Sequence, residues 1–260
     1  MSINNHPIGI FDSGVGGLSI LKAIHELLPN ENLIYVADSA FTPYGNKSDQ
    51  LIELRVLAIA EHLIKQNVKA IVVACNTATA AAVQSLRDTY SIPVIGLEPA
   101  LKPASEYTAS ARVGVLATQS TLDSQKYQAL KKKFGQQLEL VEKASPLFVE
   151  LVENAPEITE LELKLIKKEL QPFINIEVDS LVLGCTHYPF LTQAITRIMG
   201  NNVALFESGS PVANELHRRL QGSMNLSTRP GAIDYFSSDP IKAQSAFDLI
   251  LDDKVKIHQF

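Results

Sequence analysis

The sequence predicts an α/β fold made of two similar three-layer halves, each with a mainly parallel sheet and with the active site in the cleft between them. Short runs rich in β-branched and other apolar residues recur along the chain, and most are followed by a stretch with helical spacing. These runs do not alternate with polar residues, which is typical of strands that are buried on both faces. An internal repeat of the same pattern predicts the two halves.

Nine segments have the strand pattern, and helices are expected between them. In chain order the segments are 8–12, 33–38, 70–75, 93–97, 112–118, 138–143, 180–185, 203–208 and, with the weakest pattern, 233–238. In "KSDQLIELRVLAIAEHLIKQ", Ser48 is the expected N-cap, because apolar residues follow it at helical spacing. In "SPVANELHRRLQG", Ser210 is the expected N-cap and Pro211 the first helical residue.

Two pairs of similar segments lie nearly the same distance apart. "IGIFDS" resembles "VGVLAT", with 105 residues between Gly9 and Gly114. "VVACNT" resembles "VLGCTH", with 110 residues between Cys75 and Cys185. Each half would therefore carry one cysteine where a strand turns into a helix. The last forty or so residues have no counterpart, so we expect a first, discontinuous domain of residues 1–97 plus 212–260 and a second domain of residues 98–211.

The composition excludes several classes of protein. The chain has 260 residues, of which 46% are hydrophobic and 20% charged, and its net charge of −5 offers no basic field for nucleic acid. The first residues lack the pattern of a signal peptide, and no run of about 18 apolar residues predicts a membrane span. A cytoplasmic location is therefore expected, in which the two cysteines would be free thiols.

Polar side chains gather where the predicted strands end. They are Asp12, Ser13, Asp38, Cys75, Asn76, Thr77, Thr118, Cys185, Thr186 and His187. Ligands of open α/β sheets bind at this edge. Taken singly, each residue has a structural explanation: a lone cysteine is usually a small buried hydrophobe, and a threonine at a strand end is usually a helix cap. The repetition of a cysteine at one topological position is harder to explain by packing.

Two thiols in these positions have a definite chemistry. A helix N-terminus stabilises a nearby thiolate, and its N–H groups suit a carboxylate. An unperturbed thiol has a pKa of about 8.5, which is suitable for proton transfer near neutral pH. Two thiols that face each other across a carboxylate site could remove a proton from one side of a carbon and return one to the other side. That reaction inverts a stereocentre.

Six segments together resemble the cofactor-independent glutamate racemases of the aspartate/glutamate racemase superfamily. They are "FDSGVGGLS", "TPYGNKS", "VVACNTATA", "GLEPALKPA", "SPLFVELVE" and "LVLGCTHYPFL", in this order between about Ile8 and Ala213. The two cysteine motifs combined with "PYG" are specific, whereas any one of them alone is weak. The resemblance implies that Cys75 takes the α-proton from D-glutamate and that Cys185 takes it from L-glutamate.

The resemblance also implies the remaining roles. Asp12 and Glu153 would assist proton movement near Cys75, and His187 would do so near Cys185. The residues that grip L- or D-glutamate would be Asp12, Ser13, Tyr44, Gly45, Asn76, Thr77, Thr118, Thr186 and His187. Neither pyridoxal phosphate nor a metal ion is implied as a cofactor. The expected product, D-glutamate, would supply cell-wall peptidoglycan, and a homodimer is compatible with the resemblance.

The sequence departs from the family pattern at three points. Ser145 and Thr42 stand where relatives often have cysteine and arginine, and Glu150 stands where proline is common. Glu150 and Glu153 are three residues apart on one predicted helix face, so either could be the assisting carboxylate.

Five alternatives remain open at this point. Gly14-x-Gly16-x-x-Ser19 with Asp38 on the next strand resembles a dinucleotide-binding motif, although its third glycine is missing. The two cysteines with His187 could form a metal site or, without it, a disulfide. An aspartate racemase of the same superfamily is a closer rival, which "CTH" disfavours because aspartate-specific relatives tend to carry glutamate at the His187 position. The last alternative is a binding protein that has lost catalytic turnover.

Overall fold

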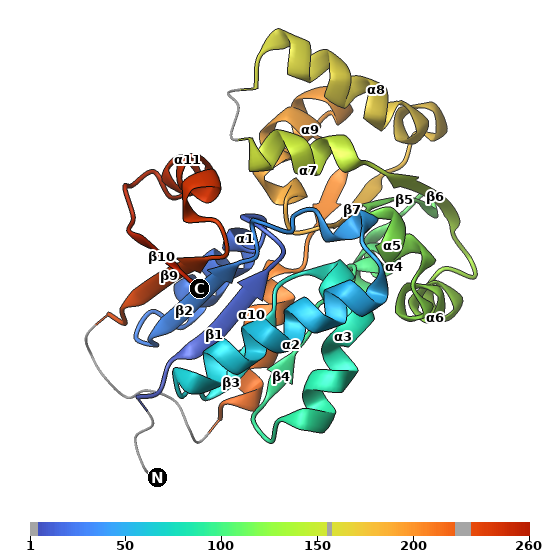
Figure 1. The fold of residues 1–260 in the computed structure, drawn as a ribbon. Coiled ribbons are helices and arrows are strands. Elements are labelled where there is room, and N and C mark those ends of the chain that lie inside the picture. Colours follow the sequence, from blue (N-terminus) through green and yellow to red (C-terminus); the bar gives the residue numbers. More distant parts are fainter. Residues whose placement is uncertain (1–4, 155–157, 222–229) are drawn as a thin grey trace.

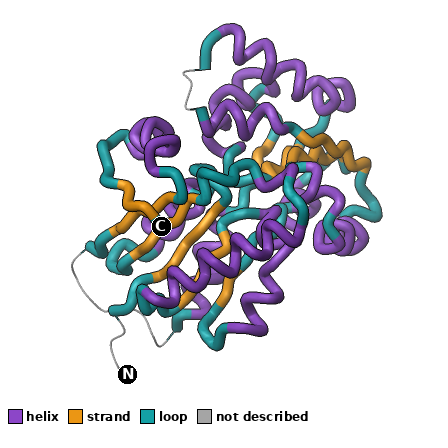
Figure 2. The backbone as a smooth tube through the Cα atoms, in the orientation of Figure 1, coloured by secondary structure: helices purple, strands orange, loops and turns teal. Residues whose placement is uncertain are grey.

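Strands and helices alternate along nearly the whole chain (Figures 1 and 2). The structure is a computed structural model that describes residues 5–154, 158–221 and 230–260. Its elements are β1 (Ile8–Asp12), α1 (Leu18–Leu27), β2 (Leu33–Ala37), η1 (Tyr44–Asn46), α2 (Asp49–Lys65), β3 (Ala70–Val73), α3 (Asn76–Thr89), β4 (Val94–Ile95), α4 (Leu101–Tyr107), β5 (Arg112–Ala117), α5 (Gln119–Asp123), α6 (Gln125–Phe134), β6 (Glu139–Ala144), α7 (Pro146–Glu153), α8 (Glu160–Ile176), β7 (Ser180–Gly184), η2 (Tyr188–Leu191), α9 (Thr192–Met199), β8 (Ala204–Phe206), α10 (Gly209–Arg219), β9 (Ile233–Ser237), α11 (Pro240–Leu251) and β10 (Ile257–Gln259).

The strands form two parallel sheets with the same internal order. The first sheet runs β10-β9-β2-β1-β3-β4, and the second runs β6-β5-β7-β8. If β5 is matched to β1, the order 6-5-7-8 of the second sheet repeats the order 2-1-3-4 of the first. Strands β3 and β7, which precede the two cysteines, therefore occupy equivalent places. The prediction of two similar α/β halves is confirmed.

All nine predicted strands are present, although some ends differ by one or two residues. Strand β10 was not predicted, because its short sequence "IHQ" lacks an apolar run. Ser48 caps α2 as expected, with its side chain accepting a hydrogen bond from the Leu51 N–H. The prediction for α10 was wrong: the helix starts at Gly209 after Ser208, so Ser210 lies inside it.

Helices cover both faces of each sheet, which explains the unbroken apolar strands. One core cluster joins a face of the first sheet, under α1, α10 and α11, to a face of the second sheet, under α7, α8 and α9. A second cluster packs α2 and α3 on the other face of the first sheet. A third packs α4 and α6 on the second sheet. The shared cluster holds the two halves against each other.

The repeated glycines allow close packing of one helix in each half. A Cβ atom added to Gly9 would lie 2.9 Å from the Leu63 side chain of α2. A Cβ atom added to Gly114 would lie 2.7 Å from the Phe173 ring of α8 and 2.7 Å from Leu181. Helices α2 and α8 hold equivalent places, so the repeat preserves a point of contact as well as a strand order.

The chain crosses between the sheets twice. The first crossing lies between β4 and β5, and the second lies between β8 and β9, which returns to pair with β2. Helix α10 spans the boundary expected between residues 211 and 212, and it packs against α1. We therefore propose that the second crossing lies near residue 208, just before α10, and that the first lies near residue 97.

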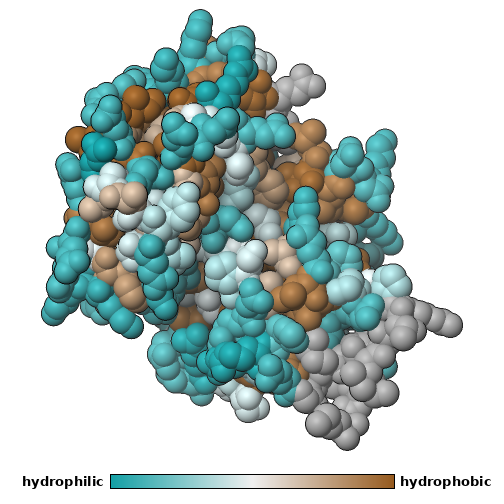
Figure 3. Space-filling view, turned by 180° about the vertical axis from the view of Figure 1, so that it is seen from behind, coloured by the Kyte–Doolittle hydropathy of each residue, from teal (hydrophilic) through white to brown (hydrophobic). Residues whose placement is uncertain are grey.

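The surface is mainly polar on the face seen in Figure 3, with hydrophobic side chains scattered between hydrophilic ones. Within the described parts of the chain, none of the helices combines the length and the apolar character needed to cross a membrane.

The Gly114→Ala substitution should lower the free energy of unfolding by about 1–3 kcal/mol, because the new methyl group overpacks the contact with Phe173. In a Phe173→Leu background the added loss should be smaller, because the shorter side chain vacates part of that space. Urea unfolding of the four chains measures both effects. Stabilisation by Gly114→Ala, as expected where a glycine only adds backbone freedom, would contradict the packing argument.

Candidate active site

The two cysteines follow equivalent strands, but their local settings differ. Cys75 is the N-cap of α3, and its sulfur accepts a hydrogen bond from the Ala78 N–H at 3.4 Å. Cys185 follows β7 and precedes the single 3₁₀ turn η2, so the regular helix expected after it starts only at Thr192. Both are free cysteines, and they are only 6% and 7% exposed.

Asp12, at the end of β1, connects the two cysteine regions. Its Oδ1 atom accepts hydrogen bonds from the N–H (2.6 Å) and the hydroxyl (3.2 Å) of Ser13. Its Oδ2 atom accepts from the Gly17 N–H at 2.5 Å and from the Thr186 hydroxyl at 3.1 Å. The Ser13 hydroxyl lies 3.9 Å from the Cys75 sulfur. A chain of contacts therefore runs from Cys75 through Asp12 to the residue next to Cys185.

On the other side, Cys185 is followed by a histidine–carboxylate pair. The Cys185 sulfur lies 3.7 Å from His187 Nδ1, and His187 Nε2 lies 2.6 Å from a carboxylate oxygen of Glu153. The same oxygen of Glu153 accepts a hydrogen bond from the Val15 N–H at 2.9 Å. The direct partner of Glu153 is therefore His187 on the Cys185 side, although its charge also acts on Asp12, and its expected role near Cys75 stays a prediction. Glu150 is exposed one turn earlier on α7.

Burial and neighbouring charges shift the pKa values of three of these groups. Burial raises the pKa of Asp12, and the positive charge of His187 opposes this only in part. Burial, followed by the charge of Asp12, raises the pKa of the Cys75 thiol. The charge of Cys185 makes a smaller contribution in the same direction.

His187 responds in the opposite way from an isolated buried histidine. Burial alone would lower its pKa, but the hydrogen bonds to Cys185 and Glu153 and the negative charges of both outweigh burial, so the pKa of His187 is raised. A protonated imidazole therefore lies between a carboxylate and the Cys185 sulfur. The Cys185 sulfur thus has a cationic neighbour, whereas Cys75 lies near the Asp12 carboxylate, which raises the pKa of the Cys75 thiol.

The other residues predicted to bind substrate line the contact between the halves. The Thr77 and Thr118 hydroxyls are 3.0 Å apart, although they come from different halves. A Cβ atom on Gly45 would lie 3.3 Å from that of Thr118. Asn76 is 6% exposed, and its side-chain oxygen is buried without a hydrogen-bond partner among the described residues.

Tyr44 is placed differently from its expected role. Its hydroxyl donates a hydrogen bond to Asp38 at 2.6 Å, inside the first half. Arg55, on α2, binds both oxygens of the same carboxylate, at 2.9 and 2.8 Å. Only the backbone of the "PYG" loop therefore remains for substrate contact at this point. Sequence reasoning missed Arg55, which sits within an ordinary helical pattern and carries no motif.

The glycines of the dinucleotide-like motif serve another purpose. A Cβ atom on Gly14 would overlap the Glu153 carboxylate, and one on Gly16 would overlap the His187 ring. The space that a pyrophosphate would need is filled by these two side chains. Asp38, the candidate ribose ligand, is bound by Tyr44 and Arg55. The site thus disfavours a dinucleotide.

The described residues include no group of three or more histidine, cysteine, aspartate or glutamate side chains that could hold a metal ion.

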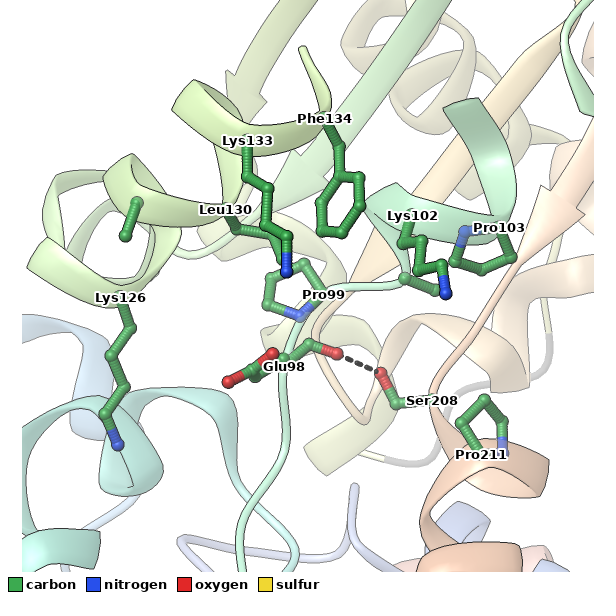
Figure 4. Close-up of a pocket in the computed structure, with 12 residues that line it drawn as sticks. Glu98, Pro99, Lys102, Pro103, Lys126, Leu130, Lys133, Phe134, Ser208 and Pro211 are labelled. Carbon is green, nitrogen blue, oxygen red and sulfur yellow. Dashed lines mark hydrogen bonds between the residues drawn. The ribbon is translucent and has the colours of Figure 1, made fainter. Parts of the chain in front are cut away.

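A pocket of about 510 Å³ lies apart from the thiols, between α6, α4 and the start of α10. It is lined by Glu98, Lys126 and Lys133 among others (Figure 4). None of the predicted site residues is among the described residues that line it.

His187 should keep its proton to a higher pH than an unperturbed histidine, whose pKa is about 6.5. Glu153→Gln removes the carboxylate at 2.6 Å, which is one of the groups that oppose the effect of burial. The pKa of His187 should therefore be lower in this variant than in the unsubstituted protein. Glu150→Gln is the matched control on the same helix. An NMR titration of the imidazole signals, assigned with His187→Asn, checks this, and an unchanged titration in Glu153→Gln would contradict the pairing.

The sign of the linked stability follows from the raised pKa. The folded state binds this proton more tightly than the unfolded state does. The stability that the pair contributes is therefore fully present below about pH 6.5 and is lost as the pH rises through the pKa of His187 in the folded protein.

Comparison with known proteins agrees with this geometry. A family model described as Asp/Glu/Hydantoin racemase matches residues 8–215. The glutamate racemase of Methylococcus capsulatus is 47% identical over 242 residues, which cover 92% of this chain and 89% of that protein. The structure of Escherichia coli glutamate racemase in complex with L-glutamate and the activator UDP-MurNAc-ala has a TM-score of 0.87 and 30% identity, covering 98% of this chain and 97% of that one.

A second solved structure matches over a similar length. Glutamate racemase from Francisella tularensis in complex with D-glutamate has a TM-score of 0.80 and 33% identity, and the match covers 98% of this chain and 97% of that one. The family match spans both cysteines and all of Asp12, Glu153 and His187. The chain therefore belongs to the Asp/Glu/Hydantoin racemase family.

Proposed function

We propose that this protein is a glutamate racemase that interconverts L- and D-glutamate without a cofactor, using two cysteines as its acids and bases. The observation that carries the proposal is the equivalent placement of Cys75 and Cys185 at the ends of β3 and β7, within one buried polar cluster. The cluster has groups to hold or move a proton beside each sulfur: Asp12 and Ser13 on one side, His187 and Glu153 on the other.

The relatives support glutamate as the substrate. The similar proteins of Methylococcus, Escherichia and Francisella are all glutamate racemases, and the last two have structures with L-glutamate and D-glutamate, respectively. At 47% identity over most of both chains, the Methylococcus protein extends the match well beyond the site motifs. Aspartate racemisation is the nearest alternative, and a comparison of L-aspartate with L-glutamate as substrates decides between them.

In the proposed reaction each cysteine acts on one face of the α-carbon. With L-glutamate, the Cys185 thiolate takes the α-proton as the Cα–H bond breaks, and the Cys75 thiol donates a proton to the opposite face. With D-glutamate the two roles are exchanged. The raised pKa of Cys75 favours the neutral thiol there, which is the state that donates a proton when L-glutamate is the substrate.

Substrate recognition would use polar groups at the seam between the halves. The first N–H groups of α3 have no partners within the helix and can bind a carboxylate, and the buried Asn76 oxygen can accept a hydrogen bond from the substrate ammonium group. Thr186 and Ser13 offer hydroxyls next to Asp12. Thr77, Thr118 and the backbone of Gly45 would complete the site.

The cellular role follows from the reaction. We propose that the enzyme works in the cytoplasm and supplies D-glutamate for peptidoglycan, as the family resemblance implies. A homodimer is part of the same proposal, and light scattering on the purified protein tests it. A protein that binds glutamate without turnover is the alternative from another class, and assays of racemisation distinguish it.

Cys75→Ser and Cys185→Ser should each reduce racemisation by about 10²–10⁴-fold, because a serine hydroxyl is too weak an acid to replace a thiol in proton transfer. The assay follows the loss of optical rotation of L-glutamate by circular dichroism, without added cofactor. In D₂O, NMR should show deuterium at Cα of the D-glutamate formed by the unsubstituted enzyme. Full activity in either variant, with the fold intact, would refute the two-cysteine mechanism.

A further inference from the structure

Ser120 forms a contact across the two halves that its sequence position does not indicate. It lies on α5, in the half that carries Cys185, and its hydroxyl donates a hydrogen bond to the Gly45 carbonyl oxygen at 2.8 Å. Gly45 belongs to η1 in the other half. A serine in the first turn of a helix usually serves the helix itself, but here the helix is capped by Thr118. The Ser120 hydroxyl is thus used between the halves.

The Gly45 loop is packed closely against α5 at this point. Helix α5 contacts both η1 and α3. The Thr77–Thr118 hydrogen bond, 3.0 Å long, lies next to the Ser120 contact. A third side-chain hydrogen bond joins the halves on this side, from the Lys126 ammonium group on α6 to the Thr79 carbonyl oxygen of α3 at 2.9 Å. Three side-chain hydrogen bonds therefore close the seam between the halves beside the start of α3, where Cys75 is the N-cap.

A surface pocket of about 440 Å³ lies directly outside this seam. Thr77, Ser120, Asp123 and Lys126 are among the residues that line it. It shares Thr77 with the proposed substrate site. The pocket of about 510 Å³ in Figure 4 shares none of the proposed site residues among the described residues around it. Of these two pockets, only the smaller one is lined by a residue of the proposed substrate site.

The thiols are reached only if the halves separate. Cys75 and Cys185 are 6% and 7% exposed, and Asp12 between them is fully buried. An amino acid must nevertheless lie between the two sulfurs to be racemised. The hydrogen bonds along the seam must therefore break and re-form for each substrate molecule. Among the residues whose side chains donate these bonds on this side, Ser120 and Lys126 are outside the proposed binding set, and Ser120 is the one that holds the Gly45 loop.

We propose that Ser120 stabilises the closed enzyme, because its hydroxyl holds the Gly45 loop against α5; we call this contact the latch. In the same proposal, glutamate reaches the thiols through the seam beneath the 440 Å³ pocket. Ser120 is a positioning residue, which touches the loop and not the substrate. The identity of the ligand rests on the proposed function, but the opening of the seam can be measured without it.

Thiol modification in the absence of substrate measures that opening. The chain has two cysteines, and both lie behind the seam, so their rate of reaction with a thiol reagent reports the open fraction when opening is fast. Ser120→Ala should increase this rate about fivefold, the factor expected for the loss of one ordinary hydrogen bond. Added glutamate should slow it.

Two further variants make the result specific. Ser120→Thr keeps a hydroxyl and should react at the rate of the unsubstituted enzyme. Ser105→Ala is the matched control, because the Ser105 hydroxyl bonds within its own helix, to the Lys102 carbonyl oxygen. The latch would be refuted if the rate of thiol modification were unchanged in Ser120→Ala. It would also be refuted if the thiols of Ser120→Thr reacted as fast as those of Ser120→Ala.

Kinetics give a second readout. Ser120→Ala should raise KM for glutamate about fivefold without lowering kcat, because the closed state is weakened and the reacting groups are untouched. A fall in kcat at unchanged KM would assign Ser120 to the chemistry and overturn the latch. If no variant or parent racemises glutamate while the thiol rates follow the pattern above, the proposed function fails and the latch stands.

Discussion

The fully buried carboxylate of Asp12 is the interaction on which the arrangement of the site depends. Burying a carboxylate is costly unless hydrogen bonds compensate for the lost water, and four donors do so here: two from Ser13, one from Gly17 and one from Thr186. The first three lie in the loop after β1, and the fourth comes from the other half. Satisfying this one group therefore aligns the two strand ends that carry the cysteines. The same charge raises the pKa of Cys75.

The repeated topology produces equivalent positions without equivalent chemistry. Cys75 and Cys185 follow matching strands of two sheets with the same order, yet one sulfur caps a regular helix and lies near Asp12, whereas the other lies beside the His187–Glu153 pair. A reaction that is run in both directions needs one acid and one base at any moment. In the proposed reaction the chirality of the substrate would select which thiol acts first.

Close packing between the halves makes this asymmetry possible. Gly14 and Gly16 have no side chains, and their places are taken by Glu153 and His187 from the other half. A larger residue at either position would force the Glu153 or His187 side chain to shift, and a shift of Glu153 would disturb its contact with the Val15 N–H. The same packing buries both sulfurs, so a site that is dry enough to control proton positions must also open to exchange substrate.

The sequence by itself determined the two α/β halves and the places of both cysteines, because buried parallel strands and strand-end turns leave local patterns that can be recognised. The repeat of Gly9 and Cys75 at Gly114 and Cys185 indicated that the halves are related. The sequence did not determine which thiol Glu153 serves, what Arg55 and Ser120 bind, or why Gly14 and Gly16 are glycines. Those contacts join residues far apart in the chain, and only the packing of the two halves brings them together.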